Sequence, residues 1–142
     1  MKKNKLVMIM AILLVAITLV GAIAVVVILK VTGEDKEKEL TIDEVLEASV
    51  DIPQMTANLA SNDFIRISFK IQTDSVTAKE ELEKRDFQVK NIIILELSEK
   101  TAEDLKGKEG QQKLENDLKT KISEIMQEGK VEHVYITESL LQ

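Results

Sequence analysis

The chain has 142 residues, with 19 basic and 25 acidic side chains, and carries a net charge of −6 at pH 7. An acidic chain repels nucleic acid and anionic lipid head groups, so we expect neither as a partner. The sequence contains no cysteine. Disulfides, lipid attachment at cysteine and a cysteine nucleophile are therefore excluded.

The first element is an uncharged apolar run of 24 residues from Leu6 to Leu29. A helix of this length rises about 36 Å, which exceeds the roughly 30 Å hydrocarbon core of a bilayer. The run contains no ionisable residue that would mark a proton or ion pathway. It therefore predicts a transmembrane helix over 6–29 that does not conduct by itself.

The charges beside this run predict its orientation. Lys2, Lys3 and Lys5 precede it, whereas an acidic stretch follows Lys30. Because positive flanks stay in the cytoplasm, residues 1–5 are predicted to be inside and the chain from about residue 31 outside. A cleaved secretory signal is the alternative, but the run is about twice the usual length and 31–33 lack a small-x-small cleavage pattern. We predict an uncleaved signal anchor.

Residues 30–40 are mostly charged and predict a solvated tether. The remaining segment, 41–142, suffices for one domain and is too short for two. Beyond residue 30 the chain carries all 25 acids and 15 basic residues (19 less Lys2, Lys3, Lys5 and Lys30), a net charge of −10. With only three Phe and one Tyr, the core must consist mainly of Ile, Leu and Val.

The first half of this domain predicts a short helix and a β-hairpin. Thr41 and Glu44 fit a capping box and predict a helix over 42–48. A strand over 49–59 follows, and Pro53 favours an edge position for it. Ser61-Asn62-Asp63 predicts a tight turn. Alternating apolar residues then predict a strand over 65–71 with one buried face, at Ile65, Ile67, Phe69 and Ile71.

The second half predicts helices and a last strand. Charge pairs four residues apart predict one helix over 77–98, with the β-branched run Ile92–Ile94 as a strand alternative. Thr101–Leu105 reads as a turn, and Gly107 and Gly110 are expected to bracket a break between helices. A further helix contains the apolar positions Leu114, Leu118, Ile122 and Ile125, with Gly129 as its C-terminal stop.

A final strand over 131–138 places Val134 and Ile136 toward the core and His133 and Tyr135 on the opposite face. Two strands, helices and a strand in this order predict an α+β fold. We expect a small antiparallel or mixed sheet with helices covering one face.

The sequence offers no convincing catalytic, cofactor-binding or metal site. His133 is the one histidine and reads as an ordinary strand residue. The pair Gly107-x-x-Gly110 lacks the glycine spacing and the Lys-Ser/Thr pair of a phosphate loop. Glu103 and Asp104 diverge on a helix and read as a solvated face. We predict a non-enzymatic protein without cofactors or a small-molecule substrate.

Several short segments, in their order and spacing, resemble the family of the flagellar basal-body-associated protein FliL. These segments are Thr56–Ala60 before the hairpin turn, the strand Phe64–Ile71, the junction Leu97–Gly107 with Gly110 and Leu114, and the closing Val134–Glu138. The resemblance covers nearly all of the chain, including the anchor.

The resemblance implies a non-enzymatic accessory protein of the bacterial flagellar motor, anchored in the cytoplasmic membrane at the basal body. It implies a fold similar to stomatin-type (SPFH) domains, stator proteins of MotA and MotB type as partners, and ring-like self-association around a stator that supports motility. A membrane-anchored extracytoplasmic sensor or adaptor is the alternative, which would need a concave pocket with convergent polar groups.

Overall fold

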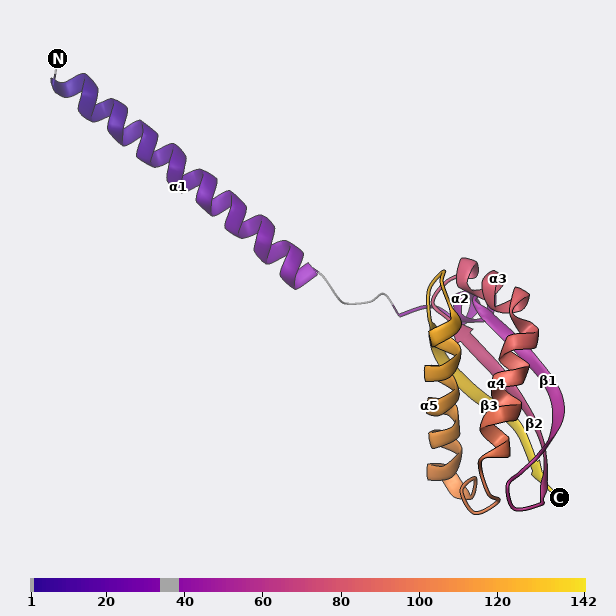
Figure 1. Cartoon of the computed structure of the whole chain (residues 1–142). Coiled ribbons are helices and arrows are strands. Elements are labelled where there is room, and N and C mark those ends of the chain that lie inside the picture. The colour runs from indigo at the N-terminus through magenta and orange to yellow at the C-terminus, as the bar shows by residue number, and fades with distance from the viewer. Residues whose placement is uncertain (1, 34–38) are drawn as a thin grey trace. The chain divides into compact units, whose positions relative to one another are not determined.

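A computed structural model describes residues 2–33 and 39–142. The chain divides into two compact units, one ending at Glu39 and one comprising Leu40–Gln142 (Figure 1).

The first unit contains one long helix, α1 (Lys2–Gly33). Its segment Lys2–Thr32 is the one helix in the described residues that is long and apolar enough to cross a membrane, which is consistent with an anchor. The hydroxyl of Thr18 donates to the carbonyl oxygens of Leu14 and Val15, each at 2.9 Å, so it stays satisfied without water. The helix includes the first residues of the predicted tether, while 34–38 lie outside the described residues.

The second unit is α+β, as the sequence predicted. Its elements are α2 (Ile42–Glu47), β1 (Ser49–Asn58), β2 (Phe64–Thr73), α3 (Val76–Lys84), α4 (Asp86–Ser98), α5 (Gly107–Ile125) and β3 (Val131–Leu141). The sheet is antiparallel in the order β1-β2-β3. Helices α3, α4 and α5 cover one face of it (Figure 1). The capping box at Thr41 and Glu44 is present at the start of α2.

The predicted hairpin is confirmed. Asn62 has a positive φ of 64° in the turn, and the hydroxyl of Ser61 donates to Asp63 at 2.7 Å. Strand β1 lies at an edge, and its register shifts between Ile52 and Met55, around Pro53. Proline has no backbone N–H to donate to the neighbouring strand, so the register shift lies where a hydrogen bond between the strands is missing.

The core lies between the sheet and the three helices. Its largest fully buried side chains from β2 are Ile65, Ile67, Phe69 and Ile71, as the alternation predicted. The helices contribute Leu82 from α3, Val89, Ile93 and Leu97 from α4, and Leu114, Leu118 and Ile122 from α5. On β3, Val134 is buried and Ile136 packs against this cluster. The strand continues to Leu141, which pairs with Ile65.

The prediction of a single helix over 77–98 was wrong, because the chain breaks at Arg85. Arg85 has φ −92° and ψ 16°, which ends α3, and α4 begins at Asp86. In one continuous helix, Asp86 would occupy the apolar stripe between Leu82 and Val89. The break instead places its carboxylate in the first turn of α4, where the helix dipole favours a negative charge. The run Ile92–Ile94 is helical.

The roles predicted for the glycines were also wrong. Helix α5 begins at Gly107, which has a φ of +70°, and continues through Gly110. A Cβ on Gly110 would lie 2.4 Å from the carbonyl oxygen of Asp104, so this glycine allows a close backbone approach. Helix α5 ends at Ile125, and Gly129 lies beyond it with a φ of +113°. Gly129 lies in the turn before β3, where a Cβ added to it would clash with the side chain of Asp74.

Candidate functional site

The segment between α4 and α5, residues 99–106, joins three parts of the domain; we call it the junction. Its own turn is closed by Thr101 and Asp104, since the Thr101 N–H donates to Asp104 Oδ2 (2.8 Å) and the Asp104 N–H to Thr101 Oγ1 (3.2 Å). The β-hairpin is bound to it, because the Ala60 N–H donates to the Lys100 carbonyl oxygen at 2.8 Å. These bonds hold the hairpin turn against the start of α5.

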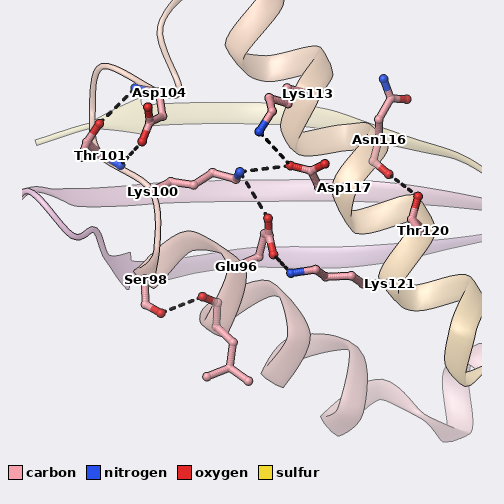
Figure 2. A network of polar contacts seen from close by, with 11 residues as sticks. Glu96, Ser98, Lys100, Thr101, Asp104, Lys113, Asn116, Asp117, Thr120 and Lys121 are labelled. Carbon is pink, nitrogen blue, oxygen red and sulfur yellow. Dashed lines mark hydrogen bonds and ion pairs between the residues drawn. The ribbon is translucent and has the colours of Figure 1, made fainter.

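A cluster of charges links α4 to α5 beside the junction (Figure 2). We call it the ionic cluster; its members are Glu96, Lys100, Lys113, Asp117 and Lys121. Glu96 is only 5% exposed, and Lys100 Nζ lies 3.2 Å from its Oε1 and 3.1 Å from Asp117 Oδ2. Lys121 binds the second oxygen of Glu96, and Lys113 lies 3.7 Å from Asp117. The buried carboxylate is thus held by two ammonium groups from different elements.

The pKa values of this cluster follow from its pairing. Burial by itself would raise the pKa of Glu96, but hydrogen bonds from Lys121 and Lys100 outweigh it and lower the pKa. Burial likewise opposes the charged form of Lys100, yet hydrogen bonds to Asp117 and Glu96 raise its pKa. Glu96 and Lys100 are therefore held in their charged forms, which suits a structural clamp and not a general acid or base near pH 7.

Glu81 forms a second clamp, which binds α3 to the loop after α5. Its carboxylate accepts from the backbone N–H of Gln127 (2.9 Å) and Glu128 (2.5 Å) and pairs with Arg85 at 2.8 Å. Burial would raise its pKa, but the hydrogen bond from Arg85 and then those from Gln127 and Glu128 lower it. This carboxylate too is used for holding the fold together.

The residues considered as catalytic candidates do not converge. His133 is exposed on β3 opposite Gln72, with its ring 5.5 Å from that of Tyr135. Glu103 pairs with Lys106 at 3.0 Å, whereas Asp104 caps the junction. In the described ranges, 2–33 and 39–142, no group of three acidic, His or Cys residues could hold a metal ion.

The sheet face that the helices leave uncovered is polar. Lys70 pairs with Asp51 at 3.2 Å, and Ser68 and Thr137 share a hydrogen bond of 3.1 Å across β2 and β3. The hydroxyl of Tyr135 donates to Gln72 at 3.4 Å. This face therefore satisfies its own polar groups through cross-strand pairs. The sequence alternation in β2 predicted a solvated face, and Arg66 is exposed, but Ser68 and Gln72 are buried, so that prediction was wrong for these two residues.

Both edges of the sheet carry features that oppose the addition of another strand. Pro53 and the register shift interrupt the edge of β1. On the other edge, the backbone N–H of Ile136 in β3 donates to Glu115 Oε1 of α5 at 3.1 Å. A charged side chain bound to an edge N–H and a proline are both known means of blunting sheet edges. Contacts with partners are therefore favoured elsewhere.

Helix α4 carries an exposed apolar strip, which sequence reasoning did not predict. Phe87 is 72% exposed, Leu95 57% and Ile94 45%. Its other face, with Val89, Ile93 and Leu97, is buried in the core. The signal in the sequence was the run Ile92–Leu95, which is too long to lie on one face of a helix.

Comparisons with known proteins relate the chain to flagellar proteins. Residues 49–142 match the family model "Flagellar basal body-associated protein FliL". The chain is 46% identical to "Flagellar protein FliL" of Bacillus subtilis (strain 168) over 110 residues, which are 78% of this chain and 79% of that protein. It is 29% identical to "Flagellar protein FliL" of Aquifex aeolicus (strain VF5) over 93 residues, 63% of this chain and 58% of that protein.

Proposed function

Since this chain belongs to the FliL family of non-enzymatic proteins associated with the flagellar basal body, we propose that it braces stator units of MotA and MotB type. In this proposal the outer domain self-associates into a ring around the extracytoplasmic part of a stator. The ring favours the engaged, ion-conducting state of the stator and so supports motility.

The observation that carries this proposal is how the domain uses its buried charges. Glu96 and Lys100, the most buried members of the ionic cluster, join helices to each other, and Glu81 joins a helix to a loop. The pKa of each of these three groups is shifted so as to favour its charged form. None of them is therefore poised to exchange a proton near pH 7. A domain of this kind suits a mechanical role, which requires a rigid structure and no catalytic group.

The anchor supports the same role. It presents no ionisable residue between Leu6 and Leu29, so ion translocation falls to a partner. We propose that residues 1–5 face the cytoplasm and that the domain 41–142 lies outside it, held near the membrane by the short segment 30–40. Anchoring many copies in one membrane raises their effective concentration, so individually weak contacts between domains suffice for a ring.

Bracing requires the domain to bind the active state of the stator more tightly than the inactive one. The test is the torque of single motors under high load in a strain with an in-frame deletion of the gene, with and without the gene restored. Stepwise torque reports the number of engaged stators and the force of each. A restored loss of steps, or of step size, supports the proposal.

Unchanged torque with normally built flagella would overturn stator bracing. The sensor or adaptor reading would then gain support, and a wall ligand would be sought. The ring is tested separately by the size of full-length protein solubilised from membranes. Purely monomeric protein over a wide concentration range, both in detergent and in vesicles, would contradict the ring.

A further inference from the structure

Helix α2 lies directly before the sheet, and the domain covers very little of it. The helix has six residues, Ile42–Glu47, and none of them is buried. Ile42 is 71% exposed and Leu46 49%, and Val45 is the one residue of α2 that is half-buried. A helix shorter than about 12 residues is unstable in water by itself. The burial of its side chains therefore contributes little to keeping α2 in place.

Contacts within the segment favour its helical shape. In the capping box, the N–H of Glu44 donates to Thr41 Oγ1 at 3.3 Å, and the N–H of Thr41 donates to Glu44 Oε2 at 2.8 Å. At the other end of the helix, the hydroxyl of Ser49 donates to the carbonyl oxygen of Val45 at 2.5 Å. These contacts join residues three or four apart, so they stabilise a helical turn wherever the segment lies.

The contact that fixes α2 to the sheet lies at its C-cap, Ala48. Ala48 is only 3% exposed, and its carbonyl oxygen accepts from the N–H of Thr73 at 3.0 Å and from the Thr73 hydroxyl at 2.6 Å. Thr73 is fully buried at the end of β2, and its hydroxyl also lies 2.8 Å from the carbonyl oxygen of Ser75. We call the two hydrogen bonds to the Ala48 carbonyl oxygen the latch.

We infer that α2 is a releasable strap, which leaves the sheet when the latch opens while the rest of the domain stays folded. Opening exposes the small side chain of Ala48 and the covered part of Val45, whereas Ile42 and Leu46 are already exposed. The hydrophobic core contains no residue of 41–48, so it stays closed when this segment leaves. Elements with few buried apolar contacts open at a lower free energy than the core of the same domain.

Release of the strap lengthens the chain between the anchor and the sheet. Six helical residues rise about 9 Å, whereas six extended residues span about 20 Å, a gain of about 11 Å. The freed segment uncoils, because it is too short to remain helical by itself. The domain then has two maximum distances from the anchor, and it can stay bound to a partner that moves relative to the membrane. The latch opens or stays closed whatever the domain binds, so this inference does not rest on stator bracing or on the ring.

The absence of natural cysteine allows the opening to be measured by thiol labelling of the full-length protein in open membrane fragments. Ala48→Cys places a thiol at the latch, and Ala57→Cys in β1, where the alanine is 5% exposed, is the matched control. A water-soluble maleimide should label Ala48→Cys at least about tenfold faster than Ala57→Cys, because the second thiol is exposed only when the sheet opens. Equal rates would overturn the proposal. Fraying that stops at Glu47 leaves Ala48 buried and gives equal rates.

Variants of Thr73 test the latch itself. Thr73→Val removes the hydroxyl and keeps the shape of the side chain, so it should speed labelling of Ala48→Cys about fivefold, whereas Thr73→Ser keeps the hydroxyl and should have much less effect. Labelling of Ala57→Cys and of Ala78→Cys, a fully buried position in α3, should not change. An unchanged rate at Ala48→Cys, or the same acceleration at all three thiols, would overturn the role of the latch.

Hydrogen exchange of the unsubstituted protein gives a second measurement that does not depend on a cysteine at the latch. The N–H of Ala48 and the N–H of Thr73, which donates to Ala48, should both exchange at least about a hundredfold faster than the N–H of Ile67 in the centre of β2. Exchange at Thr73 separates release of the strap from fraying, because fraying leaves this hydrogen bond in place. Protection of both groups equal to that of Ile67 would overturn the proposal.

Discussion

Helices α4 and α5 cover the same sheet but differ in what they leave exposed. Helix α5 turns Leu114, Leu118 and Ile122 into the core and leaves polar side chains outside, among them Gln111, Gln112, Lys113, Asn116, Thr120 and Lys121. Helix α4 buries Val89, Ile93 and Leu97 in the same manner yet also exposes Phe87, Ile94 and Leu95. One apolar face suffices for a helix that only supports the core. The second apolar face of α4 is therefore not required for packing against the sheet.

The two helices also stabilise the domain through different polar contacts. They are joined by the ionic cluster, in which α4 provides the buried Glu96 and α5 provides Asp117 and Lys121. Helix α5 in addition covers an edge N–H of β3 through Glu115. Variants on each face can separate the contribution to the fold from the contribution to contacts with partners.

The largest effect is expected where the two helices meet. Glu96→Ala removes one of the two carboxylates that pair with the partly buried Lys100, together with the partner of Lys121, and should lower the free energy of unfolding by about 4 kcal/mol. The measurement is urea unfolding of the full-length protein in detergent, followed by circular dichroism. Glu103→Ala removes the exposed pair with Lys106 and should have little effect. An equal loss from both variants would show that burial of the cluster does not matter.

The buried face of α5 should be nearly as sensitive. Leu118→Ala leaves a cavity at a fully buried position between α5 and the sheet, and should cost about 3 kcal/mol in the same unfolding experiment. The exposed Thr120→Ala on the same helix is the control and should change the free energy of unfolding by less than about 0.5 kcal/mol. A small effect of Leu118→Ala would mean that the site collapses around the smaller side chain.

Much of the fold could be predicted from local sequence patterns. The alternation in β2, the capping box at Thr41 and the turn at Asn62 each depend on neighbouring residues alone, and each is confirmed. The long apolar run predicted the one helix, among the residues that the structure describes, that is long and apolar enough to span a membrane. The α+β class followed from the order of these elements.

The errors arose where contacts distant in sequence decide the structure. The break at Arg85 lies between two segments that both favour a helix, so local propensity could not reveal it. Gly110 is required by the backbone of Asp104, which only the folded junction brings close. The ionic cluster pairs α4 and the junction with α5 across 17 to 25 residues, whereas the sequence reading considered charges four residues apart. The exposed strip on α4 was not predicted either.

Acid should weaken the link between the two helices. The pKa values of Glu96 and Asp117 are lowered in the folded state, so their contribution to stability is complete above the unfolded values of 4.5 and 3.8 and is lost as pH falls through the folded ones. For Lys100 the folded pKa is raised, so its contribution is complete below 10.5 and is lost as pH rises through the folded value.

The contribution of this cluster to the free energy of unfolding should therefore be constant between about pH 4.5 and 10.5. On the acid side it should fall by up to about 1.4 kcal/mol per pH unit for each proton taken up. The check is a series of urea unfolding curves from pH 3 to 7. Glu96→Gln should show a shallower acid slope, because one titrating carboxyl is gone. Parallel pH profiles for the wild type and Glu96→Gln would contradict the assignment to this cluster.

The role of α5 at the edge of the sheet should give a smaller effect. Glu115→Ala exposes the N–H of Ile136 to water and should cost about 1 kcal/mol, the usual net value of one hydrogen bond. Hydrogen exchange at Ile136 should accelerate more than exchange at Val134, its neighbour on the strand. Glu124→Ala, an exposed acidic position on the same helix, is the control. Unchanged exchange at Ile136 would show that the carboxylate does not protect this edge.

The smallest effect on stability is expected at the most exposed apolar side chain. Phe87 contacts solvent over most of its surface, so Phe87→Ser should change the free energy of unfolding by less than about 0.5 kcal/mol. Ile93→Ala, two turns along α4 but fully buried, should cost several times more. If Phe87→Ser is as destabilising as Ile93→Ala, the exposed face of α4 belongs to the fold after all. If instead it leaves stability unchanged, only the buried face of α4 contributes to the fold, and the exposed face is free for another role.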